Sequence, residues 1–379
     1  MNQSISNPKK QLEPGTNPLF NWLNRHAGLV FILPSVIIVL ALSIFPLIIS
    51  AYLSLSRLKF VQGGLEIKFV GFANFRKLLL GSERKHFRGD LGVLSIWQWL
   101  FVALVVALLI YLLSRYIRSQ EFKIGGLIYR IVVFSILSWG SYYLMQNLSS
   151  DGRPGTVVVT LIYVFVGLFF QYFIGLSLAL ITTQKLPGRR FFRTIFLLPM
   201  MITPVGIGYT FRMLTDTSKG PFKPILRAFG LEEYSWVSDP WGARWAVVIG
   251  DVWQWTPFVF IILLAAIEGL PNELFEAAHV DGANRWQIFW NITMPQIIPV
   301  SATIILIRMI EAFKIIDLPN VLTFGGPGTA TESLTLQSFF NWRTLDVGGS
   351  AAIGYMLMFI SLFIATSYAN LIYQKLRRF

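Results

Sequence analysis

Polar side chains lie inside two apolar stretches of the chain, where groups that need hydrogen bonds are costly. The first stretch is DVWQWTPF, residues 251–258. Helical steps of three, one and three residues put one set of its side chains on a single side: Asp251, Gln254, Trp255 and Phe258. Aromatic faces beside a few polar groups suit sugar rings, whose C–H faces are apolar and whose hydroxyls need hydrogen bonds. This stripe is therefore predicted to line a solute path.

A second stripe with the same spacing lies in RMIEAFKII, residues 308–316. Its members are Arg308, Glu311, Ala312 and Ile315. Two alternatives to a solute path remain open. Arg308 and Glu311 could neutralise each other or pair with another subunit. Trp253 and Trp255 could belong to an aromatic belt at the outer membrane interface.

A third segment, ELFEAAHVDGANRWQIFWNITMPQIIP (273–299), is a polar interruption between two apolar runs. Pro271 and Asn272 predict the start of a short helix, and Gly282 predicts its end, because glycine readily adopts the left-handed conformation. The stretch NRWQIFWNI (284–292) predicts a second short helix before the next apolar run. Small alanines allow close approach of another surface, and short exposed helices commonly dock in grooves. A linker that touches only lipid headgroups is the alternative.

The composition defines the class of protein that must position these residues. Of 379 residues, 54% are hydrophobic and only 13% are charged, whereas soluble domains average about 25% charged residues. The chain therefore reads as a polytopic α-helical membrane protein. The net charge of +13 comes largely from basic residues at the ends of apolar runs, which indicates membrane anchoring and no nucleic-acid partner.

Enzymatic chemistry finds little support in the sequence. The absence of cysteine excludes disulfides and thiolate metal sites. The three histidines, His26, His86 and His279, are too scattered for a helical metal pair. No serine elbow or paired-carboxylate pattern stands out, so we predict no catalytic residues and no metal site.

Eight membrane spans are predicted, each of about 20 mostly apolar residues. They lie roughly at 28–53, 92–113, 125–145, 156–182, 194–215, 245–267, 296–316 and 351–373. Each is expected to be a helix, because irregular backbone exposed to lipid is not tolerated. The predicted fold class is therefore all-α integral membrane, a polytopic helix bundle.

Lysine and arginine in the loops predict that both termini are cytoplasmic, with 1–25 a polar tail. The segment around Gly282 then falls in a cytoplasmic loop. Loop 54–91 is an exception, because it would lie outside and yet is rich in basic residues. Its segment FVGFANFRKLLL (69–80) is expected to lie along the outer interface as an amphipathic segment.

The polar interruption resembles the EAA motif of bacterial ABC-importer permeases, which reads Glu-Ala-Ala, three residues, Gly, nine residues, Ile-x-Leu-Pro. The matching residues are Glu276, Ala277, Ala278, Gly282 and Ile292-Thr293-Met294-Pro295, with Met in place of Leu. The longer form, EAAxxDGA, is present through Asp281 and Ala283. Three further segments resemble the carbohydrate-uptake, maltose-permease-like branch: FVGFANFRKLL (69–79), GRRFFRTIFLLPMMITPVGIG (188–208) and LTFGGPGTATESL (322–334). The resemblance covers about 27–80 and 155–379.

This resemblance implies a permease subunit in the bacterial inner membrane. The implied partners are a second permease, two copies of an ATPase subunit, an external solute-binding protein and a sugar or sugar-like solute. The residues expected to couple to the ATPase are Glu276, Ala277, Ala278, Asp281, Gly282 and Ala283. ATP and Mg²⁺ would bind to the ATPase, since this chain has no GxxxxGK[ST] loop of its own. Motion would follow as rigid-body alternating access.

The family core has six spans, so the resemblance divides the chain into parts. These are a tail (1–25), the first core span with its external loop (26–91), an inserted pair of spans (92–150), and the remaining core (151–379) with a coupling loop (268–295). The inserted pair is expected either to pack against lipid or to contact another protein.

The two polar stripes coincide with positions that contact sugar in the maltose-type subunit. Here they carry Asp251, Arg308 and Glu311, where that subunit has uncharged amides and a serine. This departure puts maltose in doubt and leaves a polyol, an oligosaccharide, a phosphorylated glycerol or a charged sugar derivative open. A secondary transporter driven by an ion gradient is the alternative function, but it would show internal repeats and broken helices, and no convincing repeat is present.

Overall fold

The computed structural model describes residues 28, 31–62, 64–118, 124–184, 187–214, 216, 219–221, 223–228, 230 and 238–376. The predicted tail, 1–25, lies outside these residues. The chain divides into two compact units, 1–53 and 54–379. In the first, a long apolar helix begins at Phe31 and contains a π-helical stretch, Leu40–Ile44. The helix is long and apolar enough to cross a membrane.

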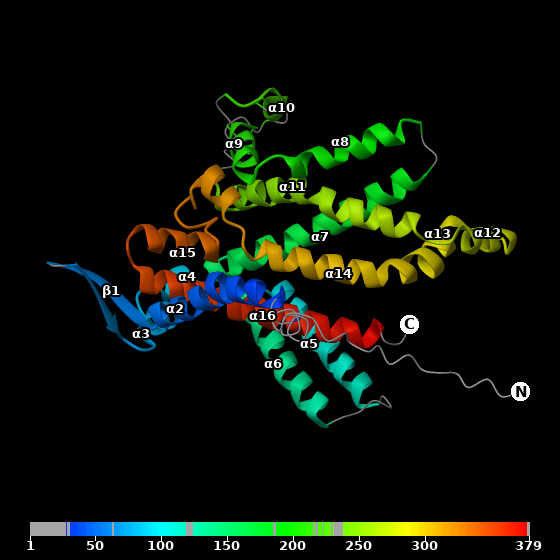
Figure 1. Cartoon of the computed structure of the whole chain (residues 1–379). Coiled ribbons are helices and arrows are strands. Elements are labelled where there is room, and N and C mark those ends of the chain that lie inside the picture. Colours follow the sequence, from blue (N-terminus) through cyan, green and yellow to red (C-terminus); the bar gives the residue numbers. More distant parts are fainter. Residues whose placement is uncertain are drawn as a thin grey trace, which may run out of the picture. The chain divides into compact units, whose positions relative to one another are not determined.

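The second unit is built around long helices, as the hydropathy predicts. They are α5 (Ile96–Ile117), α6 (Ile124–Asn147), α7 (Thr156–Thr183), α11 (Pro240–Glu268), α14 (Met294–Ala312) and α16 (Val347–Leu376). Figure 1 shows α7, α11 and α14 running side by side, and each of the three contacts the other two. Among the described residues of the whole chain, seven helices are suited to span a membrane, or eight if one bent pair counts as a span. The predicted polytopic helix bundle is therefore confirmed.

The bent pair corrects the predicted span 194–215. Instead of one helix, the structure has α8 (Arg189–Met201) and α9 (Pro204–Leu214), which meet at 98°. Ile202 is extended, with ψ 139°. Pro204 disfavours helical backbone at Thr203, the residue before it, and occupies the first position of α9, to which proline is well suited.

The span predicted at 296–316 also has different bounds. The chain is helical from Arg285 to Ala312 without a break. It consists of α13 (Arg285–Ile288), a π-helical stretch (Phe289–Thr293) and α14. The second short helix predicted at 284–292 is therefore the beginning of the membrane helix.

Short elements connect the long helices. They are the hairpin β1–β2 (Ser56–Val61 and Gly64–Phe69), α3 (Ala73–Leu79), α4 (Arg84–Arg88), the two-residue strands β3 (Gly89–Asp90) and β4 (Arg153–Pro154), α10 (Lys223–Ala228), α12 (Asn272–Val280), a π-helical turn (Pro319–Thr323) and α15 (Leu334–Arg343). The sequence prediction did not include the hairpin. The segment expected at the outer interface contains α3, whose Leu78 is 1% exposed and packs in a cluster with Ala352 and Ile353 of α16. One face of α3 therefore packs against protein.

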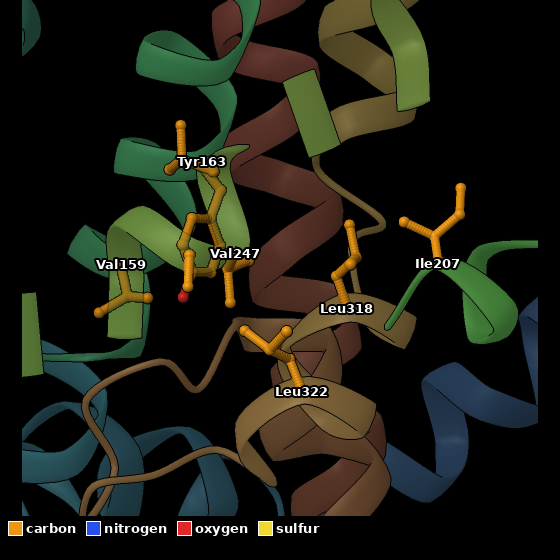
Figure 2. Close-up of a cluster of buried hydrophobic side chains, with 8 residues drawn as sticks. Val159, Tyr163, Ile207, Val247, Leu318 and Leu322 are labelled. Atoms are coloured by element: carbon orange, nitrogen blue, oxygen red, sulfur yellow. The ribbon is translucent and has the colours of Figure 1, made fainter. Parts of the chain in front are cut away.

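A buried cluster holds the core helices together where α9 begins. Val159 and Tyr163 of α7, Val247 of α11 and Ile207 of α9 converge there (Figure 2). Leu318 and Leu322, which follow α14, complete it. Tyr163 also donates a hydrogen bond to the Thr331 carbonyl, 3.0 Å away. The cluster fixes the polypeptide that follows α14 against α7 and α11.

Candidate solute path and coupling loop

The predicted coupling helix forms as α12, and Gly282 ends it. Gly282 has φ +76°, and its N–H donates to the His279 carbonyl at 3.1 Å. The Ala283 N–H reaches back to the Ala278 carbonyl at 2.9 Å. Together these bonds form a Schellman C-cap, which satisfies helix carbonyls that would otherwise lack partners. The cap fixes the angle at which the chain leaves α12.

The six predicted coupling residues differ in exposure. Glu276, Ala277, Asp281 and Gly282 are exposed, Ala283 is half-buried and Ala278 is buried. Apolar side chains nearby are exposed as well: Val280 is 88% and Trp286 is 71% exposed. A small surface that combines a carboxylate, alanines and exposed apolar groups is suited to docking against another protein.

A capping box joins the coupling loop directly to the next membrane helix. The Asn284 side chain accepts from the Gln287 N–H at 2.9 Å, and the Gln287 side chain accepts from the Asn284 N–H at 2.7 Å. This pair caps the continuous helix that ends at Ala312. The 24 residues from Arg285 to Arg308 rise about 35 Å along the helix axis. The capped end and Arg308 therefore belong to one continuous helix.

The cytoplasmic ends predicted for α7 and α11 are tied together by Arg193 of α8. Its guanidinium donates to the Thr182 carbonyl at 2.9 Å and forms an ion pair with Glu268. Arg193 lies in the segment 188–208. Its structural role is to hold the ends of α7 and α11 together next to the coupling loop.

Seven of the eight predicted solute-path residues line one cavity of about 160 Å³. They are Asp251, Gln254, Trp255, Arg308, Glu311, Ala312 and Ile315. Phe258 is not among its lining residues and packs instead against the hydrophobic cluster around Phe260 and Leu263. Pro204, at the break between α8 and α9, also lines the cavity. The two stripes therefore face a common space.

Arg308 is paired within the protein at the wall of this cavity. It is 2% exposed, and one terminal nitrogen donates to both carboxylate oxygens of Asp251, at 3.0 and 2.8 Å. Its Nε donates to Gln171 Oε1 at 2.9 Å, and Gln171 Nε2 donates to Asp251 Oδ2 at 2.7 Å. The three side chains form a closed triangle that joins α7, α11 and α14. Buried charges are tolerated when they are paired and hydrogen-bonded in this way.

Contacts within the chain decide against one alternative, the pairing of Arg308 with Glu311. Arg308 does not pair with Glu311, which forms an ion pair with Lys314 at 2.8 Å. The Arg308 guanidinium lies 4.7 Å from the ring centroid of Trp255, a cation–π distance. Trp255 therefore lines the cavity, whereas Trp253 is 41% exposed and packs against Phe211.

Gln171 is the member of the triangle that the sequence prediction missed. It lies in FFQYF (169–173), inside an apolar run, and is 1% exposed. Gln171 is a polar side chain within the predicted span 156–182, so the same sequence signal that marks the two stripes also marks Gln171.

Hydrogen bonds fix the glycine-rich loop 322–334 on the helices. Arg244 of α11 donates to the Ala330 carbonyl at 2.7 Å. Glu332 is 4% exposed and lies 2.8 Å from Nε2 of His86. Burial lowers the pKa of His86, but the hydrogen bond and charge of Glu332, with the charge of Glu83, outweigh it and raise the pKa above 6.5. This pair joins α4 to the loop.

Comparison with known proteins identifies the family. Residues 171–378, more than half of the chain, match the family described as the binding-protein-dependent transport system inner membrane component. The chain belongs to this family and is a permease subunit of an ABC importer. It is a multi-pass membrane protein.

Two relatives and one solved structure are similar to the chain. The trehalose/maltose transport system permease protein MalF of Thermococcus litoralis is 36% identical over 58% of this chain and 73% of its own length. The probable starch degradation products transport system permease protein AmyD of Thermoanaerobacterium thermosulfurigenes is 30% identical over 68% of this chain and 88% of its own. A bacterial ABC transporter involved in the import of the acidic polysaccharide alginate has a chain of the same fold, with TM-score 0.63, 19% identity and coverage of 94% and 98%.

Proposed function

We propose that this permease pairs with a second permease, two ATPase subunits and an external solute-binding protein, and moves a sugar or sugar-like solute inward by alternating access. The observation that carries the proposal is the continuous helix Arg285–Ala312. One end of this helix is capped beside the exposed helix α12, and its other end carries Arg308 at the cavity. Such a helix transmits a rigid-body displacement between two distant sites.

In this proposal α12 docks in a cleft of the ATPase subunit. Glu276, Ala277 and Asp281 face the ATPase from exposed positions, while Ala278 and the Gly282 turn set the geometry of the loop. ATP and Mg²⁺ bind to the ATPase, and closure of the ATPase dimer displaces α12. The binding free energy of ATP thereby biases the helix bundle between inward-open and outward-open states.

A crosslinking experiment tests the docking. The chain contains no cysteine, so His279→Cys introduces a single thiol on the exposed side of α12. With a photoreactive maleimide on this thiol, we expect the assembled transporter to yield a covalent product with the ATPase subunit. Glu66→Cys, on the exposed strand β2, is the matched control and is expected to give no such product. Equal crosslinking from both positions, or no crosslinking from α12, would contradict the proposed docking.

The proposed cargo is a sugar or polyol that passes Asp251, Gln254, Trp255, Arg308, Glu311, Ala312 and Ile315. Two relatives are named as transport proteins for trehalose/maltose and for starch degradation products, which supports a carbohydrate. The cavity offers an aromatic ring with amide and charged groups at its wall, as sugar binding requires. Titration of the cognate solute-binding protein against a panel of sugars and polyols tests this part, and binding of none of them would overturn it.

The proposed topology places both termini and the coupling loop (268–295) in the cytoplasm of a bacterial cell. Basic residues at the ends of the spans support this orientation. The broken pair α8–α9 is a feature that secondary transporters also show. Family membership nevertheless favours an ATP-driven importer.

A further inference from the structure

A second cavity, of about 720 Å³, lies outside the proposed solute path. Its charged lining residues are Arg84, Lys85, Arg88 and Arg153, with Asp90 and Asp151. Four cationic side chains against two carboxylates give a net charge of +2. Gly89 and Leu91 complete the wall. The residues come from loop 54–91 and from the segment between α6 and α7.

Backbone contacts build this cavity into the fold. Strands β3 and β4 pair with Asp90 opposite Arg153. Gly89 has φ +84°, and a Cβ there would lie 2.0 Å from Asn147 Oδ1, so only glycine allows the chain to pass. The Tyr143 hydroxyl, near the end of α6, donates to the Arg88 carbonyl. The cationic side chains are thus held on a fixed frame.

Of the four cationic side chains at the cavity, Lys85 alone forms an ion pair among the described residues. Lys85 pairs with Asp90 at 3.4 Å. Arg88 donates to the Leu79 carbonyl at 3.3 Å and lies 5.8 Å from the ring centroid of Tyr143. Within the described part of the chain, no carboxylate lies at ion-pair distance from Arg84, Arg88 or Arg153. Two of these arginines, Arg84 and Arg153, are exposed, so the cavity presents guanidinium groups to an incoming anion.

The cavity lies where three membrane helices meet the aqueous boundary. Leu91 shortly precedes α5, and Arg153 lies between the end of α6 and the start of α7. In an apolar stretch of 18 residues, only 11% of α5 and of α6 is buried within this chain, compared with 61% of α11. Trp97 and Trp99, in the first turn of α5, are 81% and 54% exposed, as expected for an aromatic belt at the headgroup level. The cavity is therefore at the depth of lipid headgroups.

We propose that this cavity binds the phosphodiester headgroup of an anionic phospholipid, whose acyl chains lie along the exposed apolar faces of α5 and α6. Basic pockets between membrane helices bind such headgroups through their charge and hydrogen-bond donors. The proposal gives the inserted pair α5–α6 a role and explains why loop 54–91 is rich in basic residues although the topology places it outside.

The test measures which lipid the transporter retains. The assembled transporter is equilibrated in micelles with equal amounts of phosphatidylglycerol and phosphatidylcholine, and bound lipid is counted by native mass spectrometry. Wild type is expected to retain phosphatidylglycerol preferentially. The double variant Arg84→Gln/Arg153→Gln is expected to lower this preference by about tenfold or more, since each basic residue near an anionic surface contributes roughly fivefold.

A charge-matched control separates the cavity from the general positive charge of the loop. Lys59→Gln/Lys68→Gln removes the same charge from the exposed hairpin β1–β2 and is expected to leave lipid retention unchanged. An equal effect of both double variants overturns the proposal. Displacement of the lipid by inorganic phosphate at the same concentration as the lipid also overturns the proposal, because it would indicate a site for soluble anions. Weakened binding of the solute-binding protein with unchanged lipid retention would assign the cavity to that protein.

Discussion

Arg308 is the largest of the fully buried side chains that the structure describes, and its charge determines how the cavity wall is organised. Moving an ion out of water costs several kcal/mol, and a partner of opposite charge offsets this only with good geometry and further hydrogen bonds. Asp251 and Gln171 supply both requirements. Arg308 is thus an internal tie between helices as well as part of the cavity wall, and its positive charge is already neutralised by the protein.

Removing Arg308 alone is expected to be costly. Arg308→Gln leaves the carboxylate of Asp251 buried without its cation and should lower the free energy of unfolding by about 3–5 kcal/mol. Adding Asp251→Asn should recover a large part of this loss, because the second change removes the uncompensated charge. Denaturant titration of the purified transporter measures both effects.

Lys314→Gln is the matched comparison for this double-mutant cycle. It breaks an ion pair between exposed groups and should cost less than about 1 kcal/mol. If Arg308→Gln were as mild as Lys314→Gln, or if Asp251→Asn made Arg308→Gln worse, the buried triangle would not have the role described.

At this scale the sequence predicted which residues face the cavity, but it did not predict how they pair. Helical spacing depends only on local geometry, so it placed Asp251 and Arg308 on the correct sides of their helices. Their contact joins positions 57 residues apart, and no local rule specifies it. Phe258 lies on the predicted side of α11 but is one turn too far along the helix, where hydrophobic packing takes over.

Among the elements, the helix from Arg285 to Ala312 and the bent pair α8–α9 matter most for mechanism. The first runs without a break from the loop after α12 to the cavity. The second brings Pro204 to the cavity wall through its 98° bend. Hydropathy detects apolar length but not direction, so the bend was not predicted, although Pro199 and Pro204 in the sequence are consistent with it. The end of α12 at Gly282 was predicted, because such C-caps depend on local residue types.

The contact between α4 and loop 322–334 is expected to depend on pH. The pKa of His86 is raised in the folded protein, so its ion pair with Glu332 contributes stability fully below about pH 6.5. This contribution is lost as pH rises through the raised pKa. Thermal unfolding of the purified transporter should therefore shift to lower temperature across that window.

His86→Gln provides the control for this titration. Glutamine retains a hydrogen-bonding side chain but does not titrate, so the drop in unfolding temperature above pH 6.5 should become smaller. An unchanged pH profile in this variant would show that other groups are responsible.

For the whole molecule, the similar alginate-importer chain helps to interpret the inserted pair. That match covers 94% of this chain and so omits about 23 residues, fewer than the 59 residues of the region 92–150. The inserted pair therefore cannot lie wholly outside the match. Within this chain, Leu109 of α5 and Val133 and Phe134 of α6 pack in a cluster that includes Phe363 and Leu371 of α16. The pair thus extends the bundle on the side of α16.

The basic loop 54–91 is less anomalous in the folded molecule than in the sequence. Lys77 is paired with Glu83 at 2.8 Å and with Asp346 at 3.2 Å, and Lys85 is paired with Asp90. The loop therefore presents less net charge than its lysines and arginines suggest. The positive-inside rule counts residues and does not register such pairs, which is why the sequence left this loop unexplained.

The central claim is that α12 transmits the work of the ATPase to the solute path. The most direct test measures solute uptake and ATP hydrolysis by the complete transporter in proteoliposomes that carry wild type, Glu276→Ala or Glu273→Ala. Both glutamates are exposed on α12, three residues apart. Glu276→Ala should reduce uptake by about tenfold or more and abolish the response of ATP hydrolysis to the loaded binding protein. Glu273→Ala should stay within about twofold of wild type. Undiminished uptake by Glu276→Ala, or uptake that persists without the ATPase subunit, would contradict the account.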